Sequence, residues 1–261
     1  MNNDIEQVVS SCSTCQLHLW SQQPEPLVHS TSSQPFESVS VDLFESACAH
    51  YLIMVHRFLG WPCISRLGRM GTRAVTDILR DWFVDYGVPQ IIRSDGGPQF
   101  RSEFQDFCRD MHITHQLSSA YHPASNGHAE SAVKSMKMLL QKYENNWRYF
   151  RQSLLEWRNV PRADGLSPAQ WLFGRRLRTQ VPGHPASYDC LSDGDFLAAL
   201  SKRNVDKGKV QDNFNARSSV LTPLSPNTNV LVQDPHSKKW NQSATVIRVR
   251  ENGQSYLSYL L

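Results

Sequence analysis

Apolar and polar residues follow a regular pattern over the first two thirds of the chain, and this pattern predicts a set of strands. Valine and leucine alternate with serine and aspartate over residues 36–44, which is the period of a half-buried strand. The continuous apolar run at 51–55 is typical of a central strand, and residues 63–67 suit a neighbouring one. Two β-branched residues begin the segment 91–95, which is also predicted to be a strand, and a further strand is expected at 113–117.

Apolar residues also recur every three or four positions between and after these strands, which predicts amphipathic helices. Such stripes run through residues 72–86, 102–111, 129–143 and 147–157. Strands followed by alternating helices and strands imply an α/β domain.

Residues with capping chemistry stand at the predicted helix ends. Thr72 is expected to cap its helix, and Ser102 with Gln105 matches a capping box. Ser167 precedes a proline at a predicted first helical position, and Gly174 is expected to end that short helix.

The pattern changes in the last third of the chain. Residues 192–217 are charged and predict a helical linker, and short strands are expected at 229–234, 244–250 and 255–260. Asn252-Gly253 is a strong turn signal, so we expect a hairpin between the last two strands.

Composition narrows the class of protein. The 261-residue chain is 40% hydrophobic, which supports a packed interior, and none of its apolar runs has transmembrane length. Its first residues lack the basic-then-apolar pattern of a signal peptide, so no membrane partner is expected. The six cysteines are mostly scattered, which favours a reducing intracellular setting. A net charge of +3 does not by itself indicate a nucleic-acid partner.

Three carboxylates stand where chemistry is expected. Asp42 lies within a strand pattern, where aspartate is depleted, and Asp95 ends a strand just before two glycines. Glu130 falls in the first turns of a helix. Each has a structural explanation of its own, such as an Asx-turn for Asp95 or a helix-dipole contact for Glu130. Together they indicate an oxygen-only site for Mg²⁺ or Mn²⁺, and two such ions can act on a phosphodiester.

Two smaller motifs accompany these carboxylates. Lys134 and Lys137 share a helix stripe with Glu130, so they are candidates for phosphate contacts, although lysines on an exposed face also serve solubility. Cys12 and Cys15 form one CxxC pair, which is half of a zinc site because four ligands are needed.

Several motifs in order carry a family resemblance. The segments that carry it are Val41-Asp42-Leu43-Phe44, Ser94-Asp95-Gly96-Gly97-Pro98-Gln99-Phe100, Tyr121-His122-Pro123, Ser125-Asn126-Gly127 with Glu130, and Gly165-Leu166-Ser167-Pro168-Ala169-Gln170. They resemble the Asp, Asp, Glu core of retroviral and retrotransposon integrases, with gypsy-type LTR-retrotransposon integrases as the nearest group.

The resemblance implies an architecture. It suggests a ribonuclease H-like core, a mixed five-stranded sheet flanked by helices, followed by a helical linker and a small carboxy-terminal β-barrel that stops short of its usual last strand. The expected divisions are a remnant of the zinc-binding domain, a linker, the catalytic core, the helical linker and the barrel, at residues 1–20, 21–35, 36–190, 191–220 and 221–261.

The resemblance also implies a function. The chain is expected to integrate DNA by polynucleotidyl transfer, with Asp42, Asp95 and Glu130 as the catalytic residues and as the ligands of Mg²⁺ or Mn²⁺. Its partners would be the DNA of the element ends and the target DNA, bound by a homo-oligomer in the nucleus, or otherwise the cytoplasm. Residues expected to contact DNA are Lys134, Lys137, Tyr121, His122 and Asn126.

The sequence departs from the family pattern in ways that leave alternatives open. Relatives carry two histidines upstream of the CxxC pair, but no histidine precedes Cys12, so zinc binding is not expected. The interval between Asp95 and Glu130 is one residue shorter than usual, which we attribute to a loop deletion that leaves the metal site intact. A decayed or domesticated DNA-binding protein without catalysis is one alternative. A ribonuclease H-type nuclease is the other, and the Pro-Ala-Ser-Asn-Gly loop argues against it.

Overall fold

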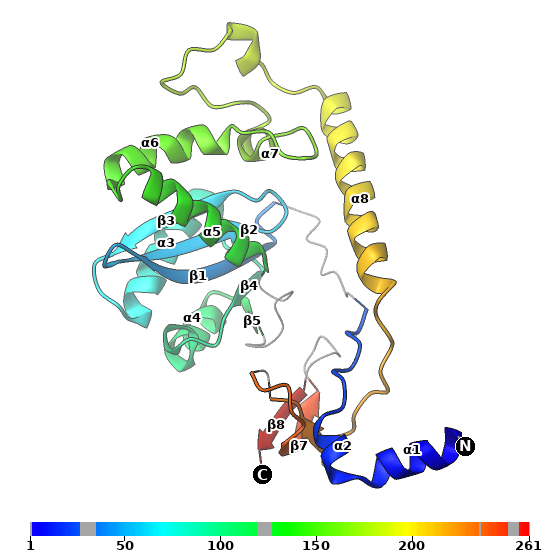
Figure 1. The fold of residues 1–261 in the computed structure, drawn as a ribbon. Coiled ribbons are helices and arrows are strands. Elements are labelled where there is room, and N and C mark those ends of the chain that lie inside the picture. The colour runs from blue at the N-terminus through cyan, green and yellow to red at the C-terminus, as the bar shows by residue number, and fades with distance from the viewer. Residues whose placement is uncertain (1, 27–34, 119–126, 235, 250–255, 261) are drawn as a thin grey trace. The chain divides into compact units, whose positions relative to one another are not determined.

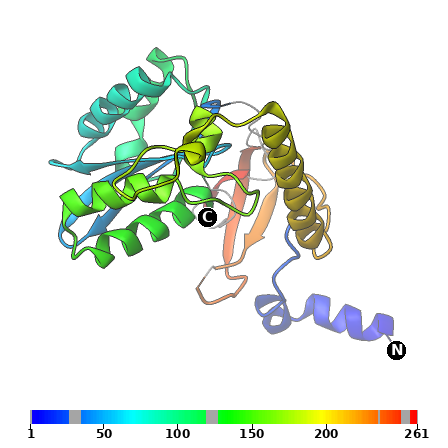
Figure 2. The ribbon, with the colours of Figure 1, turned by 90° about the horizontal axis from the view of Figure 1, so that it is seen from above.

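The structure is a computed structural model with two compact units (Figures 1 and 2). It describes residues 2–26, 35–118, 127–234, 236–249 and 256–260. One unit spans residues 30–205, and the other combines residues 1–29 with 206–261.

The larger unit is built on a five-stranded sheet with the strand order β3-β2-β1-β4-β5. The first three strands pair antiparallel, whereas β4 lies parallel to both β1 and β5. This mixed sheet is the one that the sequence predicts. The strands are β1 (Ser38–Ser46), β2 (Ala49–His56), β3 (Pro62–Leu67), β4 (Ile91–Ser94) and β5 (Thr114–Leu117).

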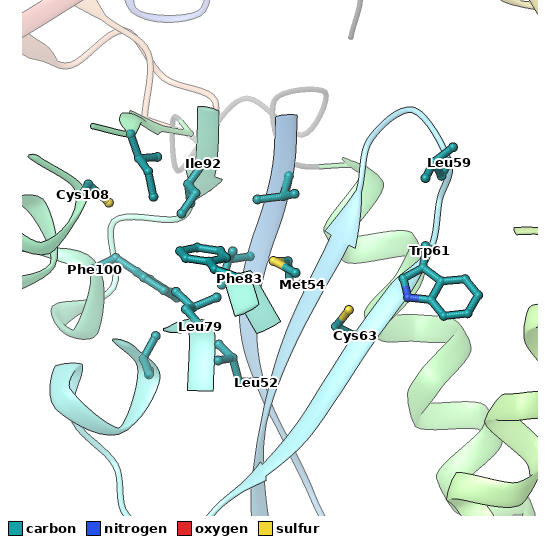
Figure 3. Packing of buried hydrophobic residues seen from close by; sticks show 14 of the residues in the cluster. Leu52, Met54, Leu59, Trp61, Cys63, Leu79, Phe83, Ile92, Phe100 and Cys108 are labelled. Atoms are coloured by element: carbon teal, nitrogen blue, oxygen red, sulfur yellow. The ribbon is translucent and has the colours of Figure 1, made fainter. Parts of the chain in front are cut away.

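The first face of the sheet packs against α3 (Thr72–Tyr86) and α4 (Ser102–Asp110). Alternate residues of the strands, such as Val41, Met54 and Ile92, are buried there together with aromatic residues from the helices. Figure 3 shows part of this cluster. The short helix η1 (Pro98–Phe100) contributes Phe100, which is 1% exposed.

The second face packs against α5 (Gly127–Lys142) and α6 (Trp147–Arg158). Met136 and Leu140 of α5 are fully buried, as the predicted apolar stripe requires. In Figure 2 the helices lie on both sides of the sheet, which confirms the layered α/β architecture. This second face carries Asp42, because Asp42 alternates with the valines of the first face.

Two of the predicted caps are wrong. The residue before the first turn of α3 is Gly71, and that of α4 is Arg101, neither with a side-chain capping bond. Thr72 and Ser102 are the first helical residues instead, so their hydroxyls do not stand at the capping position.

The third predicted cap is confirmed. Ser167 Oγ accepts from the Gln170 N–H at 3.2 Å, and Gln170 Oε1 accepts from the Ser167 N–H at 3.1 Å. This box starts α7 (Pro168–Phe173), and Gly174 ends it with a left-handed φ of 68°.

The predicted helical linker is a 23-residue helix, α8 (Asp193–Asn215), after the short helix η3 (Pro185–Tyr188). The first part of α8 belongs to the larger unit, where Arg203 is 8% exposed. Arg203 Nε donates to Asp164 Oδ2 at 2.8 Å, and its guanidinium lies 3.8 Å from the ring centroid of Trp171.

The smaller unit joins the two ends of the chain. Its helices are α1 (Asn2–Ser11) and α2 (Ser13–Leu17), and its antiparallel sheet consists of β6 (Asn229–Val232), β7 (Gln242–Val249) and β8 (Tyr256–Leu260).

Trp240 links these two parts of the smaller unit. Its backbone N–H donates to Leu17 O at 3.1 Å, and its indole N–H donates to Leu19 O at 3.0 Å. Segments that the sequence assigns to separate domains therefore share one compact unit.

Two expectations for the smaller unit are not tested. Its strands form a three-stranded sheet, and the described residues do not show a closed barrel. The Asn252-Gly253 turn lies outside the described residues. No helix in the described part of the chain combines the length and apolar character needed to cross a membrane.

Candidate active site

Asp42 is the fifth of nine residues in β1 and is partly buried. It lies within the strand, as its pattern indicates, and β1 continues to Ser46 through its antiparallel pairing with β2. On its other side, β1 pairs with β4 only over Ser38–Ser40. Asp42 therefore lies beside the place where β4 ends. Its Oδ1 accepts from the Leu43 N–H at 2.8 Å.

Asp95 directly follows the last residue of β4, as predicted. The parallel register pairs Ser40 with Arg93, so continuing both chains by two residues brings Asp42 level with Asp95. Asp95 is exposed, and its Oδ1 accepts from the Gly97 N–H at 3.1 Å. This bond is the Asx-turn that the sequence also suggested. A Cβ at Gly97 would lie 3.1 Å from that oxygen, which explains why the turn carries glycine.

Glu130 lies in the first turn of α5, next to Ala129, which is completely buried. α5 packs its apolar stripe on β1 and β2, and this contact fixes the height of the helix over the second sheet face. The Glu130 side chain is exposed.

The electrostatics of Asp42 link the three carboxylates. Burial is the largest influence and raises the pKa of Asp42, and the negative charges of Asp95 and Glu130 raise it further. The Leu43 N–H and the charge of Lys137 act in the opposite direction, and the resulting pKa is about 6. Three carboxylates with this mutual repulsion have the donor chemistry that a divalent cation requires.

The carboxylates do not form a ready-made cage. Within the ranges that the structure describes, no three His, Cys, Asp or Glu side chains are close enough together to hold a metal ion. Register and charge bring Asp42 near Asp95 and Glu130, and the predicted shared metal site remains a prediction.

The two candidate lysines of α5 differ in their surroundings. Lys137 is partly buried, and its Nζ lies 5.7 Å from the ring centroid of Phe44, the residue two positions beyond Asp42 on β1. Lys134 is exposed. Of these two lysines, Lys137 is the one whose charge acts on the pKa of Asp42. The helix thus directs one cation toward the carboxylates and the other toward solvent.

The remaining predicted site residues are not placed with the carboxylates. Tyr121, His122 and Asn126 lie outside the described residues. Cys12 and Cys15 belong to the smaller unit, at the start of α2, where Cys12 is half-buried and Cys15 is exposed. Their pKa values move apart, because a backbone bond from Cys15 lowers that of Cys12 and the Cys12 thiol raises that of Cys15.

Sequence reasoning missed other polar residues of β4, the strand that leads to Asp95. Ser94 is fully buried, and its Oγ lies 2.8 Å from His115 Nε2 of the neighbouring strand β5. Arg93 stands two residues before Asp95 and faces the same side of the sheet. The period-two rule, applied backwards from Asp95, would have identified Arg93.

Part of the chain is similar to a known family of protein domains. The sequence profile described as "Integrase core domain" matches residues 32–123. An uncharacterized protein of Caenorhabditis elegans is 27% identical over 98% of this chain, and the Pol polyprotein of Feline endogenous virus ECE1 is 30% identical over 65% of it. The chain covers 20% and 18% of the length of these two relatives.

One solved structure is similar over the whole chain. A chain of the simian T-cell lymphotropic virus intasome, solved with PP2A regulatory subunit B56 gamma, has a TM-score of 0.61 at 17% identity. The match covers 100% of this chain and 88% of that one. At this level of identity the likeness concerns the fold.

Proposed function

We propose, on the premise that this chain carries an integrase core domain of the retroviral and LTR-retrotransposon kind, that it joins DNA by metal-dependent polynucleotidyl transfer. In the first step water attacks near the 3′ end of the element's DNA. In the second, the freed 3′-hydroxyl attacks a phosphodiester of the target DNA. The observation that carries the proposal is the strand register, which brings Asp42 level with Asp95 on the sheet face that α5 covers, and the charges of Asp95 and Glu130 both act on Asp42.

The roles of the three carboxylates follow from their chemistry. Asp42, Asp95 and Glu130 would hold Mg²⁺ or Mn²⁺, which supplies Lewis-acid activation of the attacking and leaving oxygens when bound. Asp42 and Asp95 each have one oxygen fixed by a backbone N–H, of Leu43 and Gly97 respectively. These bonds orient the second oxygen of each carboxylate, so part of the ordering that binding requires is already present.

DNA binding is assigned to residues around these carboxylates. Lys137 lies beside Asp42, where its charge offsets part of the negative potential, and Lys134 is free to reach a phosphate from the exposed side of α5. We also propose that Tyr121, His122 and Asn126 contact DNA ends. A gypsy-type origin, assembly as a homo-oligomer on DNA and action in the nucleus rest on the family resemblance.

DNA binding without catalysis is a second candidate function, and one observation favours it. No three potential ligands in the described part of the chain are pre-assembled around a metal position. A chain that binds DNA without catalysis would show the same arrangement. The enzyme is the better-supported function because the like charges act on Asp42, and a protein that never binds a cation gains nothing from that repulsion.

Strand transfer with the variant Glu130→Gln separates these functions. The change keeps the size of the side chain and removes one negative charge, so transfer of a labelled oligonucleotide with Mg²⁺ or Mn²⁺ should fall at least about 100-fold. DNA affinity should remain, because it comes mainly from cationic contacts to phosphate.

The matched control is Glu103→Gln, which removes the same charge from an exposed position in the first turn of α4. This control should transfer like the unmodified chain. If the unmodified chain binds DNA but neither nicks nor transfers it with either metal, the chain is a binding protein.

A further inference from the structure

The second sheet face carries a row of cations beside the row of carboxylates. Ser40 and Asp42 point to the same side of β1, and Arg93 and Asp95 point to that same side from β4. Ser40 and Arg93 are register partners. The two aspartates follow this pair two residues further along the chain, which is a distance of about 6.6 Å in an extended strand.

Arg57 is a second arginine beside Ser40. Arg57 directly follows β2, and its backbone N–H donates to Ser38 O at 3.0 Å. Its Nη1 donates to Ser40 Oγ at 3.1 Å. Burial and then the neighbouring charge of Arg93 lower the pKa of Arg57 to about 10, and burial lowers that of Arg93. A guanidinium group keeps its charge in proteins at neutral pH, so both side chains are cations.

These cations lack the partners that buried charges normally have. Among the residues that the structure describes, neither Arg57 nor Arg93 forms an ion pair with a carboxylate. Arg93 Nε and the hydroxyl of Ser38 are buried and have no hydrogen-bond partner there. Holding two half-buried like charges side by side is unfavourable unless an anion joins them.

We propose that Arg57, Arg93 and Ser40 form a subsite for one phosphodiester group of a polynucleotide, next to the phosphate that the carboxylates would act on. The planar guanidinium forks match the oxygens of a phosphate, and the buried donors are those that such a ligand satisfies. A polynucleotide is the ligand because it carries anions in series, so one strand can occupy this subsite and reach the carboxylates. This inference rests on the proposed function for the identity of its ligand.

The test measures DNA binding by the full chain without divalent metal, as a function of salt. The double variant Arg57→Gln with Arg93→Gln is compared with Arg69→Gln with Arg73→Gln, which removes the same two charges from exposed positions before and at the start of α3. Loss of one phosphate contact should reduce the slope of log K against log salt by about 0.9 in the subsite variant. The control pair should keep the slope of the unmodified chain.

Three further measurements keep the test decisive. The thermal midpoint of the subsite variant without DNA should equal or exceed that of the unmodified chain, because the two charges removed repel each other and form no ion pair with a carboxylate of the described residues. Arg93→Lys should keep the slope but bind DNA more weakly, because it keeps the charge and loses the fork. Inorganic phosphate, added as a competitor, should displace DNA from the unmodified chain more effectively than from the subsite variant.

The outcomes separate this inference from the proposed function. Equal slopes for the subsite and control variants would overturn the subsite and leave strand transfer untouched. A large fall in thermal midpoint on Arg57→Gln with Arg93→Gln would also overturn it, because it would show that the arginines hold the fold. A reduced slope in a chain that transfers no strand would keep the subsite and remove the enzyme.

Discussion

Two regions of the larger unit bring together acidic residues and arginines but differ in how these residues are partnered. Where α8 docks on the core, Asp164 and Arg203 are 7% and 8% exposed and form an ion pair. The other oxygen of Asp164 accepts from the Leu166 N–H at 3.0 Å, and the Trp171 indole donates to the pair at 3.2 Å. Around Asp42, in contrast, carboxylates face carboxylates and two arginines face each other.

The contrast separates a structural site from a ligand site. The Asp164–Arg203 pair satisfies its donors and acceptors within the protein, so its role is to attach α8 to the core. The charges around Asp42 and those of Arg57 and Arg93 lie on neighbouring positions of the sheet, and in our proposal they are complemented by cations and by a phosphate. Substitutions should therefore affect stability in opposite directions in the two regions.

The largest effect is expected at the partnered site. Arg203→Ala should lower the free energy of unfolding of the larger unit by about 3–5 kcal/mol, because it leaves Asp164 buried and unpaired. Urea denaturation followed by tryptophan fluorescence measures this, with Lys202→Ala, at the exposed neighbouring position, as the control. Equal midpoints for the two variants would mean that α8 does not dock through this pair.

A smaller effect of opposite sign is expected at Asp42. Its pKa in the folded state, about 6, lies above the ordinary value of 3.8, so the folded protein holds that proton more tightly than the unfolded chain. Stability is therefore lost as pH rises from about 4 to 6, and the loss persists above that range. Asp42→Asn should stabilise the metal-free protein by about 1–2 kcal/mol at pH 7.5, after allowance for solvent, and by nothing at pH 4.

Thermal unfolding at several pH values checks this expectation, with Asp77→Asn on the exposed side of α3 as the control. A stabilising effect that is the same at pH 4 and pH 7.5 would contradict the assignment to ionisation. A destabilising effect at both values would place Asp42 with Asp164, as a carboxylate that the fold needs.

The smallest effect distinguishes the two lysines of α5. Lys134→Ala and Lys137→Ala should each reduce the salt slope of DNA binding by up to about 0.9 if each contacts one phosphate. Only Lys137→Ala should also move the ionisation of Asp42 to higher pH, because only Lys137 acts on its pKa. Repeating the salt and pH titrations on both variants tests the pair. The same pH response in both would show that Lys137 is an ordinary surface charge.

The sequence predicted those features of the fold and of the candidate site that depend on neighbouring residues along the chain. Period-two alternation placed Asp42 on a sheet face, and the glycines after Asp95 placed it at a strand end, as observed. The continuation of β1 to Ser46, past the predicted end at residue 44, was missed, because it depends on how far β2 pairs beyond the end of β4.

Long-range contacts account for the other differences. In the sequence, Arg203 is one of several charged residues of a polar helix. Its burial follows only from its contact with Asp164, which is 39 residues away. The contact of Trp240 with Leu19 spans 221 residues, so no local pattern could reveal that the two ends share a unit. The Arg57 subsite likewise needs the strand register that brings β1 and β4 together.

The central claim is that Asp42, Asp95 and Glu130 share divalent cations. Titration of the full chain with Mn²⁺, followed by electron paramagnetic resonance of the free ion, tests it most directly. Asp42→Asn, Asp95→Asn and Glu130→Gln should each weaken Mn²⁺ binding at least about 10-fold, the smallest loss typical even for an outer partner of a metal ligand, while Asp77→Asn should not. Unchanged Mn²⁺ affinity in any one of the three variants would contradict a site built from all three carboxylates.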